Sequence, residues 1–178
     1  MINVIVAGAA GRMGCRLVAL IRESSVLTLA GATEGKGHQA VGDDAGETAG
    51  CGRAGIPITD DLGALLDRGE VVVDFSAPEA TLHHLRTVAQ HKRAMVIGTT
   101  GFSAPQLEEV KLLACQVPCV LSPNMSVGIN LIYKVIGEMA KTLGEDYDIE
   151  VIEAHHRLKK DAPSGTALKI AEVLAKAV

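Results

Sequence analysis

Residues 3–14 read Asn-Val-Ile-Val-Ala-Gly-Ala-Ala-Gly-Arg-Met-Gly, a short β-branched run that ends in a glycine-rich turn. A helical pattern follows from about Arg12, with Met13, Leu17 and Ile21 on one apolar face. A strand, a tight glycine turn and a helix in this order are the first unit of a parallel α/β sheet. This stretch therefore predicts the fold class of the first part of the chain.

The alternation continues along the chain. Two helices are expected to open with Pro in the first turn and a capping box, Ser76–Glu79 and Ser103–Gln106. Strands are predicted at 26–33, 71–75, 94–97 and 118–121, and the two helices at 78–91 and 106–115. The pattern predicts a doubly wound, parallel, Rossmann-like α/β domain over residues 1–126. Residues 35–55, rich in Gly, Asp and Ala, are interpreted as a long surface excursion, and such loops are often functional.

The pattern changes in residues 127–178. A long helix is predicted at 127–143, a strand at 148–154, a polar basic loop at 155–165, and a last helix that runs to Val178. One strand cannot form a sheet, because its backbone needs partners. We therefore expect this region to be part of a second α+β domain whose remaining strands lie outside the chain.

Composition excludes several function classes. The 178 residues are 48% hydrophobic and 21% charged, which predicts a folded core rather than disorder. A net charge of -4 and 2% aromatic residues argue against nucleic-acid binding. No apolar stretch is long enough for a membrane span and the N-terminus does not resemble a signal peptide. The four cysteines, at positions 15, 51, 115 and 119, form no CxxC pair, so a reduced cytoplasmic protein is expected.

The glycine-rich turn predicts a dinucleotide site. Gly8 and Gly11 allow backbone N–H groups to approach a pyrophosphate at the start of a helix. Glu34 follows the next predicted strand, where an acidic residue accepts hydrogen bonds from ribose hydroxyls. The alternative is an ordinary strand–helix turn beside a solvated Glu. Arg12 and Lys36 are the nearest cations for a 2′-phosphate, so the choice between NADH and NADPH stays open.

The stretch Gly98-Thr99-Thr100-Gly101 follows another predicted strand. Ligands of open α/β sheets bind beyond the carboxyl ends of the strands, so this turn is suited to a nicotinamide ring. It could equally be a turn that only reverses the chain. His83 and His84 are adjacent on a helix and do not share a face, so we expect a surface or interface role for them.

The segment Glu153-Ala-His-His-Arg-Leu-Lys-Lys-Asp-Ala-Pro-Ser-Gly-Thr166 concentrates positive charge in an acidic protein. Ser164 begins a helix whose free N–H groups form a second anion site. Two anion sites suit a substrate with two carboxylates, and a histidine suits proton donation near neutral pH. A metal site is not expected, since adjacent histidines at a strand end point to opposite faces. The alternative is a solvated basic loop.

Four motifs together resemble one enzyme family across all 178 residues. They are VAGAAGRMG at the start, VIGTTGF at 96–102, SPNMSVGIN at 122–130 and EAHHRLKKDAPSGTA at 153–167. They are similar to 4-hydroxy-tetrahydrodipicolinate reductase (dihydrodipicolinate reductase), an NADH- or NADPH-dependent enzyme of the diaminopimelate route to lysine. The resemblance implies that the second domain binds a cyclic dicarboxylate substrate and, in the full-length protein, builds a homotetramer.

The resemblance also implies residue roles in cofactor binding. The Gly-rich turn would contact the pyrophosphate through Gly8, Arg12 and Met13, and Glu34 would bind the adenosine ribose. The nicotinamide end would be held by Gly98 and Thr100 with the backbone around Asn124 and Met125. Many relatives place Arg directly after the ribose-binding acid, whereas this chain has Gly35 and then Lys36.

For the chemistry, the resemblance implies that hydride passes from the nicotinamide to the substrate and that His155 donates the proton. Lys159 would be its cationic partner, and His156, Gly165 and Thr166 would bind the substrate carboxylates.

Two other functions remain possible on the residues alone. One is a non-catalytic NAD(P)-binding sensor, which would have no need for a histidine beside two anion sites. The other is a different reductase of this architecture, such as a semialdehyde dehydrogenase, which would need a reactive cysteine near the nicotinamide. Cys115 and Cys119 lie in or after a helix, where a buried structural cysteine is expected.

Overall fold

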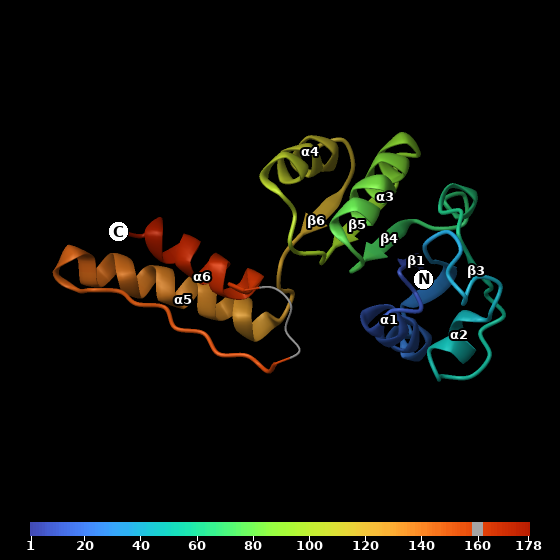
Figure 1. Ribbon diagram of the computed structural model, residues 1–178, viewed down its shortest axis with the longest axis horizontal. Helices are drawn as coiled ribbons and strands as arrows, with labels where there is room; N and C mark the ends of the chain where they lie inside the picture. Colours follow the sequence, from blue (N-terminus) through green and yellow to red (C-terminus); the bar gives the residue numbers. More distant parts are fainter. Residues whose placement is uncertain (158–161) are drawn as a thin grey trace. The chain divides into compact units, whose positions relative to one another are not determined.

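The computed structural model describes residues 1–157 and 162–178, which divide into two units, residues 1–121 and residues 122–178 (Figure 1). The first unit is built on one sheet in which every paired strand is parallel. Its strand order is β3-β2-β1-β4-β5-β6. The strands are β1 (Ile2–Ala7), β2 (Leu27–Thr33), β3 (Ile58–Thr59), β4 (Val71–Asp74), β5 (Ala94–Ile97) and β6 (Cys119–Leu121). The predicted doubly wound Rossmann-like fold is confirmed.

Helices cover both faces of this sheet because successive residues of a strand point to opposite sides. On β1, Val4 and Val6 enter one buried cluster with Val18 of α1. Ile5 enters the other cluster with Leu85 of α3. The helices of the unit are α1 (Arg12–Glu23), the short α2 (Ala45–Thr48), α3 (Pro78–Gln90) and α4 (Ala104–Ala114), with a 3-10 turn η1 (Gly63–Leu65).

The two predicted capping boxes have different outcomes. At the start of α4, the Ser103 side chain accepts a hydrogen bond from the Gln106 N–H, and the Gln106 side chain accepts one from the Ser103 N–H, so this box is confirmed. The box predicted at Ser76 is wrong. Ala77 is the N-cap of α3, and Ser76 Oγ donates instead to Asp74 Oδ1 at 2.6 Å. A hydroxyl that donates to an ionised carboxylate makes a charge-assisted hydrogen bond, which is stronger than the neutral bond it would accept from a helix N–H.

The interpretation of residues 35–55 as a surface excursion is only partly right. The segment contains α2, and Ala40 and Ala45 are buried in the core cluster beside α1. Its organising residue is Asp44, whose carboxylate accepts five backbone hydrogen bonds from Gly46, Glu47, Ala54, Gly55 and Ile56. Four of them, from Ala54, Glu47, Gly55 and Gly46, lower the pKa of Asp44 to about 2 against the opposing effect of burial, and the Ala54 bond contributes most.

The second unit contains α5 (Val127–Leu143), a 3-10 turn η2 (Gly144–Asp146) and α6 (Gly165–Ala175), with the two helices side by side (Figure 1). The strand predicted at 148–154 is wrong: this segment has no regular secondary structure. An extended segment becomes a strand only when another backbone accepts and donates its hydrogen bonds, and the described residues offer it none. None of the helices in residues 1–157 and 162–178 is both long and apolar enough to cross a membrane.

Candidate functional site

A cleft of about 510 Å³ lies at the carboxyl ends of β1 and β4, where the strand order reverses. This switch point is where open α/β sheets bind their ligands. One wall is the turn after β1 and the other is the turn after β4. The lining residues are Gly8, Ala10, Gly11, Arg12, Met13, Gly14, Glu34, Gly35, His38, Phe75, Ser76, Ala77, Ala80 and His84.

The glycine turn is shaped for close approach of the backbone to a ligand. A Cβ on Gly14 would lie 2.0 Å from the Gly8 carbonyl oxygen, so α1 can approach the turn only with glycine here. Gly8 has a φ of +68°, which L side chains rarely adopt. The N-cap Gly11 supplies no side chain to the first turn of α1. The N–H groups of that turn therefore form an anion site of the kind that holds a pyrophosphate.

Glu34 connects this turn to the end of β2. Its Oε1 accepts a hydrogen bond from the Ala10 N–H at 2.9 Å, and its Oε2 accepts one from the Gly35 N–H. The carboxylate thereby faces the cleft with its orientation fixed by two backbone donors. Arg12 and Met13 are exposed on the same cleft, whereas Lys36 is exposed and does not line it.

A buried polar network, which the sequence interpretation missed, forms the other wall. Asp74 at the end of β4 is fully buried, and its Oδ2 lies 2.7 Å from His84 Nδ1. Burial alone raises the pKa of the Asp74 carboxyl, but hydrogen bonds from His84 and Ser76 outweigh it, and the pKa lies below its ordinary value. His84 therefore does not have the surface role that its sequence suggested. The signal available in the sequence was an Asp at a strand end ten residues before a helical His.

The network continues to the turn after β5. Ser76 Oγ lies 3.4 Å from Thr81 Oγ1, which lies 2.7 Å from Thr99 Oγ1. Thr99 is buried, whereas the predicted ligand residue Thr100 is exposed. Gly98 packs directly under Phe75, because a Cβ there would meet the Phe75 ring at 1.9 Å. Gly98 and Thr100 do not line the cleft described above, and their cofactor role stays a prediction.

In the second unit, Asn124 joins the starts of both helices. Its Nδ2 donates to Thr166 Oγ1 at 3.0 Å, and its Oδ1 accepts from the N–H of Ser126, the N-cap of α5. A residue predicted to hold cofactor thus contacts one predicted to hold substrate. The neighbouring Met125 is 37% exposed, and its cofactor role stays a prediction.

Glu153 is the central residue of the predicted substrate loop. Its Oε2 lies 3.3 Å from His155 Nδ1, and its Oε1 accepts a hydrogen bond from the Ser164 N–H at 2.8 Å. Ser164 is buried and caps α6 by accepting from the Ala167 N–H. This leaves the N–H groups of Gly165 and Thr166 as the anion-binding end of α6. The sequence interpretation gave Glu153 no role, although it lies two residues before His155.

His155 and His156 are both exposed, as a proton donor and a ligand to a substrate carboxylate need to be. Lys159, the predicted cationic partner of His155, lies outside the described residues.

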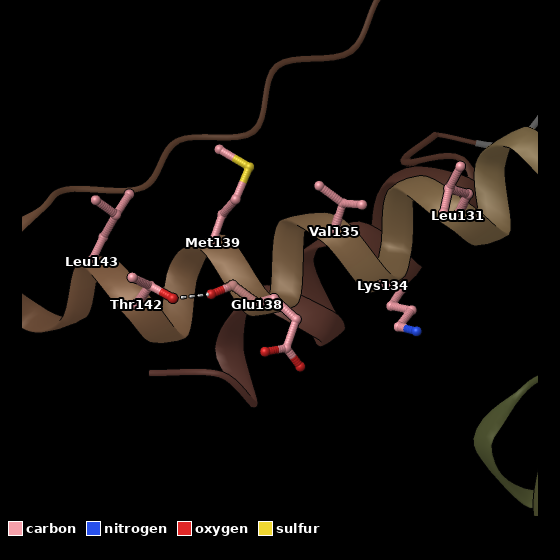
Figure 2. Close-up of a pocket in the computed structure, with 7 residues that line it drawn as sticks. All are labelled: Leu131, Lys134, Val135, Glu138, Met139, Thr142 and Leu143. Carbon is pink, nitrogen blue, oxygen red and sulfur yellow. Dashed lines mark hydrogen bonds between the residues drawn. The ribbon is translucent and has the colours of Figure 1, made fainter.

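A second cavity, of about 550 Å³, lies along α5 (Figure 2). Figure 2 shows Val135, Met139 and Leu143 on one side of the helix, with Lys134 and Glu138 directed away from them. Thr142 Oγ1 donates to the Glu138 carbonyl, a bond within the helix. None of the predicted site residues lines this cavity, and its apolar walls do not suit a dicarboxylate.

Comparison with known families gives two matches that together cover nearly all of the chain. Residues 2–125 match the family model described as "Dihydrodipicolinate reductase, N-terminus". Residues 128–178 match the one described as "Dihydrodipicolinate reductase, C-terminus".

Individual relatives agree. A protein of Syntrophus aciditrophicus named 4-hydroxy-tetrahydrodipicolinate reductase is 50% identical over all 178 residues, which cover 66% of that protein. One of the same name from Syntrophobacter fumaroxidans is 53% identical, and the chain covers 67% of it. The chain thus spans about two thirds of the length of these relatives.

Among solved structures, the dipicolinate-bound dihydrodipicolinate reductase from Paenisporosarcina sp. TG-14 has the same fold. The likeness has a TM-score of 0.75 and 29% identity, and covers 99% of this chain and 66% of that one.

Proposed function

The chain belongs to the dihydrodipicolinate reductase family, and we propose that it serves the NAD(P)H-dependent reduction of 4-hydroxy-tetrahydrodipicolinate to tetrahydrodipicolinate in the diaminopimelate route to lysine. The observation that carries this proposal is the Glu153 carboxylate, which joins His155 to the amino end of α6. A histidine beside a helix N-terminus places a proton donor next to an anion site. The reduction of a dicarboxylate needs both a proton donor and a site that binds a carboxylate.

The first unit fits a nicotinamide dinucleotide, which would supply the hydride when bound. The fit rests on the glycine turn, where no Cβ can be added at Gly14, and on the uncapped start of α1. The turn of Gly8, Gly11, Arg12 and Met13 would hold the pyrophosphate. Glu34 would accept hydrogen bonds from a ribose, since its carboxylate is already fixed at the cleft.

The remaining cofactor roles follow from the resemblance. We assign the nicotinamide end to Gly98, Thr100, Asn124 and Met125. Arg12 and Lys36 are assigned to the 2′-phosphate of NADPH because Arg12 lines the cleft with Glu34 and Lys36 follows Glu34 closely in the sequence.

The residues of the second unit perform the substrate chemistry in this proposal. With the hydride supplied by the cofactor, His155 donates a proton, and the 4-hydroxyl group of the substrate is lost as water. Glu153 keeps the His155 ring oriented by its contact with Nδ1. The N–H groups of Gly165 and Thr166 bind a carboxylate at the start of α6, with His156 as a second ligand. We assign Lys159 the role of a cation that stabilises charge near His155.

The two alternative functions are less well supported. A sensor would need only the first unit, yet the Glu153–His155 pair and the capped start of α6 occur together in the second. A semialdehyde dehydrogenase would need a cysteine thiolate. Burial raises the pKa of the Cys119 thiol, which disfavours the thiolate.

For the full-length protein we propose a homotetramer in the cytoplasm, as the resemblance implies. The exposed apolar residues of α5 support burial of this helix in a larger structure. We keep the domain boundary proposed from the sequence, residues 1–126 for dinucleotide and 127–178 for substrate.

Calorimetric titration with NADH and with NADPH tests the first half of this proposal. Both cofactors should bind, with affinities within about tenfold, or about 1.4 kcal/mol. Glu34 favours NADH, which has free ribose hydroxyls, while the positive charges of Arg12 and Lys36 favour the 2′-phosphate of NADPH. A preference beyond a hundredfold would mean that one of these residues dominates.

Pyridine-2,6-dicarboxylate should then bind to the cofactor complex, and substrate-dependent oxidation of NADH or NADPH separates a reductase from a sensor. The 178-residue chain should bind cofactor but reduce little or no substrate by itself, because residues 148–154 have no strand partner in residues 1–157 and 162–178 to support the loop that follows. Binding of neither cofactor would contradict the proposal.

A further inference from the structure

Two hydrogen bonds set the orientation of the Asn124 side-chain amide. One end of the amide lies 2.9 Å from the backbone nitrogen of Ser126, whose N–H only donates, so this end is the acceptor oxygen Oδ1. The other end is therefore the NH2 group, and Nδ2 lies 3.0 Å from Thr166 Oγ1. The backbone of Asn124 is held as well, because its carbonyl accepts from Ser122 Oγ and from Asn130 Nδ2. The backbone around Asn124 thus assigns the donor of the bond between Asn124 and Thr166.

This bond determines where the Thr166 hydroxyl can donate. A hydroxyl has one hydrogen and two lone pairs, whereas an amide NH2 group only donates. Oγ1 of Thr166 is therefore the acceptor of the bond, and its own hydrogen points elsewhere. Among the residues that the structure describes, Asn124 is the one partner of this half-buried hydroxyl. The hydroxyl hydrogen of Thr166 is left to donate to a ligand.

Thr166 is the second residue of α6, beside other groups that donate. The N-cap Ser164 accepts from the Ala167 N–H, so the cap does not use the N–H groups of Gly165 and Thr166. N–H groups at a helix start bind anions. The Thr166 hydroxyl adds a third donor to these two. A carboxylate, which only accepts hydrogen bonds, matches a set of groups that all donate.

We propose that Asn124 is a positioning residue of the substrate site: by occupying a lone pair of Thr166 Oγ1, it directs the hydroxyl hydrogen toward a substrate carboxylate. The inference rests on the proposed function, in which Thr166 binds that carboxylate. Without Asn124 the hydroxyl can rotate, and its hydrogen has no preferred direction. Asn124 also precedes Met125 in the segment assigned to the nicotinamide end, so its amide connects this segment to the substrate site.

The main test measures the affinity of the NADH complex for pyridine-2,6-dicarboxylate by calorimetry. NADH affinity is measured first for each variant, and the dicarboxylate is titrated at saturating NADH. Asn124→Ala removes the donor, so the dicarboxylate should bind about three- to tenfold more weakly, the effect of one neutral hydrogen bond. Asn130→Ala is the matched control, because Asn130 donates to the Asn124 and Ser126 carbonyls but does not contact Thr166. Its dicarboxylate affinity should equal that of the unaltered chain.

A double-mutant cycle separates positioning of Thr166 from general support of the fold. Thr166→Val removes the hydroxyl with little change of shape and should weaken dicarboxylate binding about ten- to hundredfold, since a hydrogen bond to a charged group is lost. Thr166→Ser keeps the hydroxyl and should retain most of the affinity. In the Thr166→Val background, Asn124→Ala should have no effect beyond about twofold, because the group that it positions is gone. A role in folding alone would give the same loss in both backgrounds.

Three results would overturn the role of Asn124 and leave the proposed substrate site in place. They are unchanged dicarboxylate affinity in Asn124→Ala, an equal loss in the Thr166→Val background, and a loss of the same size in Asn130→Ala. Failure of the unaltered NADH complex to bind the dicarboxylate would overturn the proposed substrate site and this inference with it.

Discussion

The two candidate sites are supported by different kinds of structure, a parallel sheet in the first unit and a loop beside a helix in the second. The dinucleotide cleft stands on the ends of hydrogen-bonded parallel strands, and its polar residues are fixed by backbone donors or by a fully buried carboxylate. In the described part of the candidate substrate loop, the partly exposed side chain of Glu153 and the cap of α6 tie the loop to the helix. The comparison indicates that the cleft of the first unit is held by its own sheet, whereas the described part of residues 148–154 gives the second candidate site no strand to support it.

The largest expected effect lies in the substrate loop. In a protein extended to the length of its relatives, His155→Ala should lower kcat by about 10²–10⁴-fold, as for loss of a positioned general acid, with KM nearly unchanged. Lys159→Ala should lower kcat and also raise KM, because a charge-assisted hydrogen bond of about 1.5–3 kcal/mol to the substrate is lost. Steady-state oxidation of NADH measures both. Cofactor affinity should be the same in both variants, and equal turnover of His155→Ala and the unaltered protein would remove the proton-donor assignment.

The next effect probes the cleft. Gly14→Ala places a Cβ 2.0 Å from the Gly8 carbonyl oxygen, so the turn must move, and NADH affinity should fall by about a hundredfold, or about 2.7 kcal/mol. Gly11→Val should abolish NADH binding, because the side chain would keep the pyrophosphate away from the backbone N–H groups of the turn. Gly128→Ala in α5 is the control, since the nearest atom to its Cβ would be 3.8 Å away. Calorimetry that finds normal binding in Gly11→Val would exclude the pyrophosphate assignment.

A third prediction concerns the segment around Asp44 in the first unit. The folded-state pKa of about 2 lies below the ordinary value of 3.8, so the carboxylate stabilises the fold above pH 4, and this stabilisation is lost as the pH falls toward 2. Asp44→Asn should lower the thermal midpoint at neutral pH and flatten its pH dependence between pH 4 and 2. Circular dichroism against pH measures both, and an unchanged acid profile in the variant would show that other carboxylates govern it.

The smallest effect compares the helix caps of the two units. Ser103→Ala and Ser164→Ala each remove one N-cap and should each cost about 1 kcal/mol of unfolding free energy. Only Ser164→Ala should also weaken binding of pyridine-2,6-dicarboxylate to the cofactor complex, because Ser164 caps the helix whose start is proposed to bind the carboxylate. Denaturant unfolding and calorimetry separate these outcomes. Equal effects of both variants on dicarboxylate binding would place the anion site elsewhere.

The sequence predicted some of the residues at the candidate sites and missed others. The glycine turn and Glu34 were found because turn chemistry and the spacing of an acid after the next strand are local patterns. Glu153 and the Asp74–His84 pair were missed. Their significance depends on which atoms face one another, and the identity of His84 rather than His83 is decided only by the rotation of α3 against β4.

By itself, the sequence determined the alternation of strands and helices in the first unit, the helix at 127–143 and the capping box at Ser103, because these follow from periodicity and from contacts within a few residues. The tertiary structure decided the rest. Ser76 donates to Asp74 instead of capping α3. Asp44 accepts backbone hydrogen bonds that order the segment interpreted as a surface excursion. Residues 148–154 are not a strand. In each case the outcome depends on a hydrogen-bond partner supplied, or not supplied, by a distant or buried part of the chain, and no local pattern reports that partner.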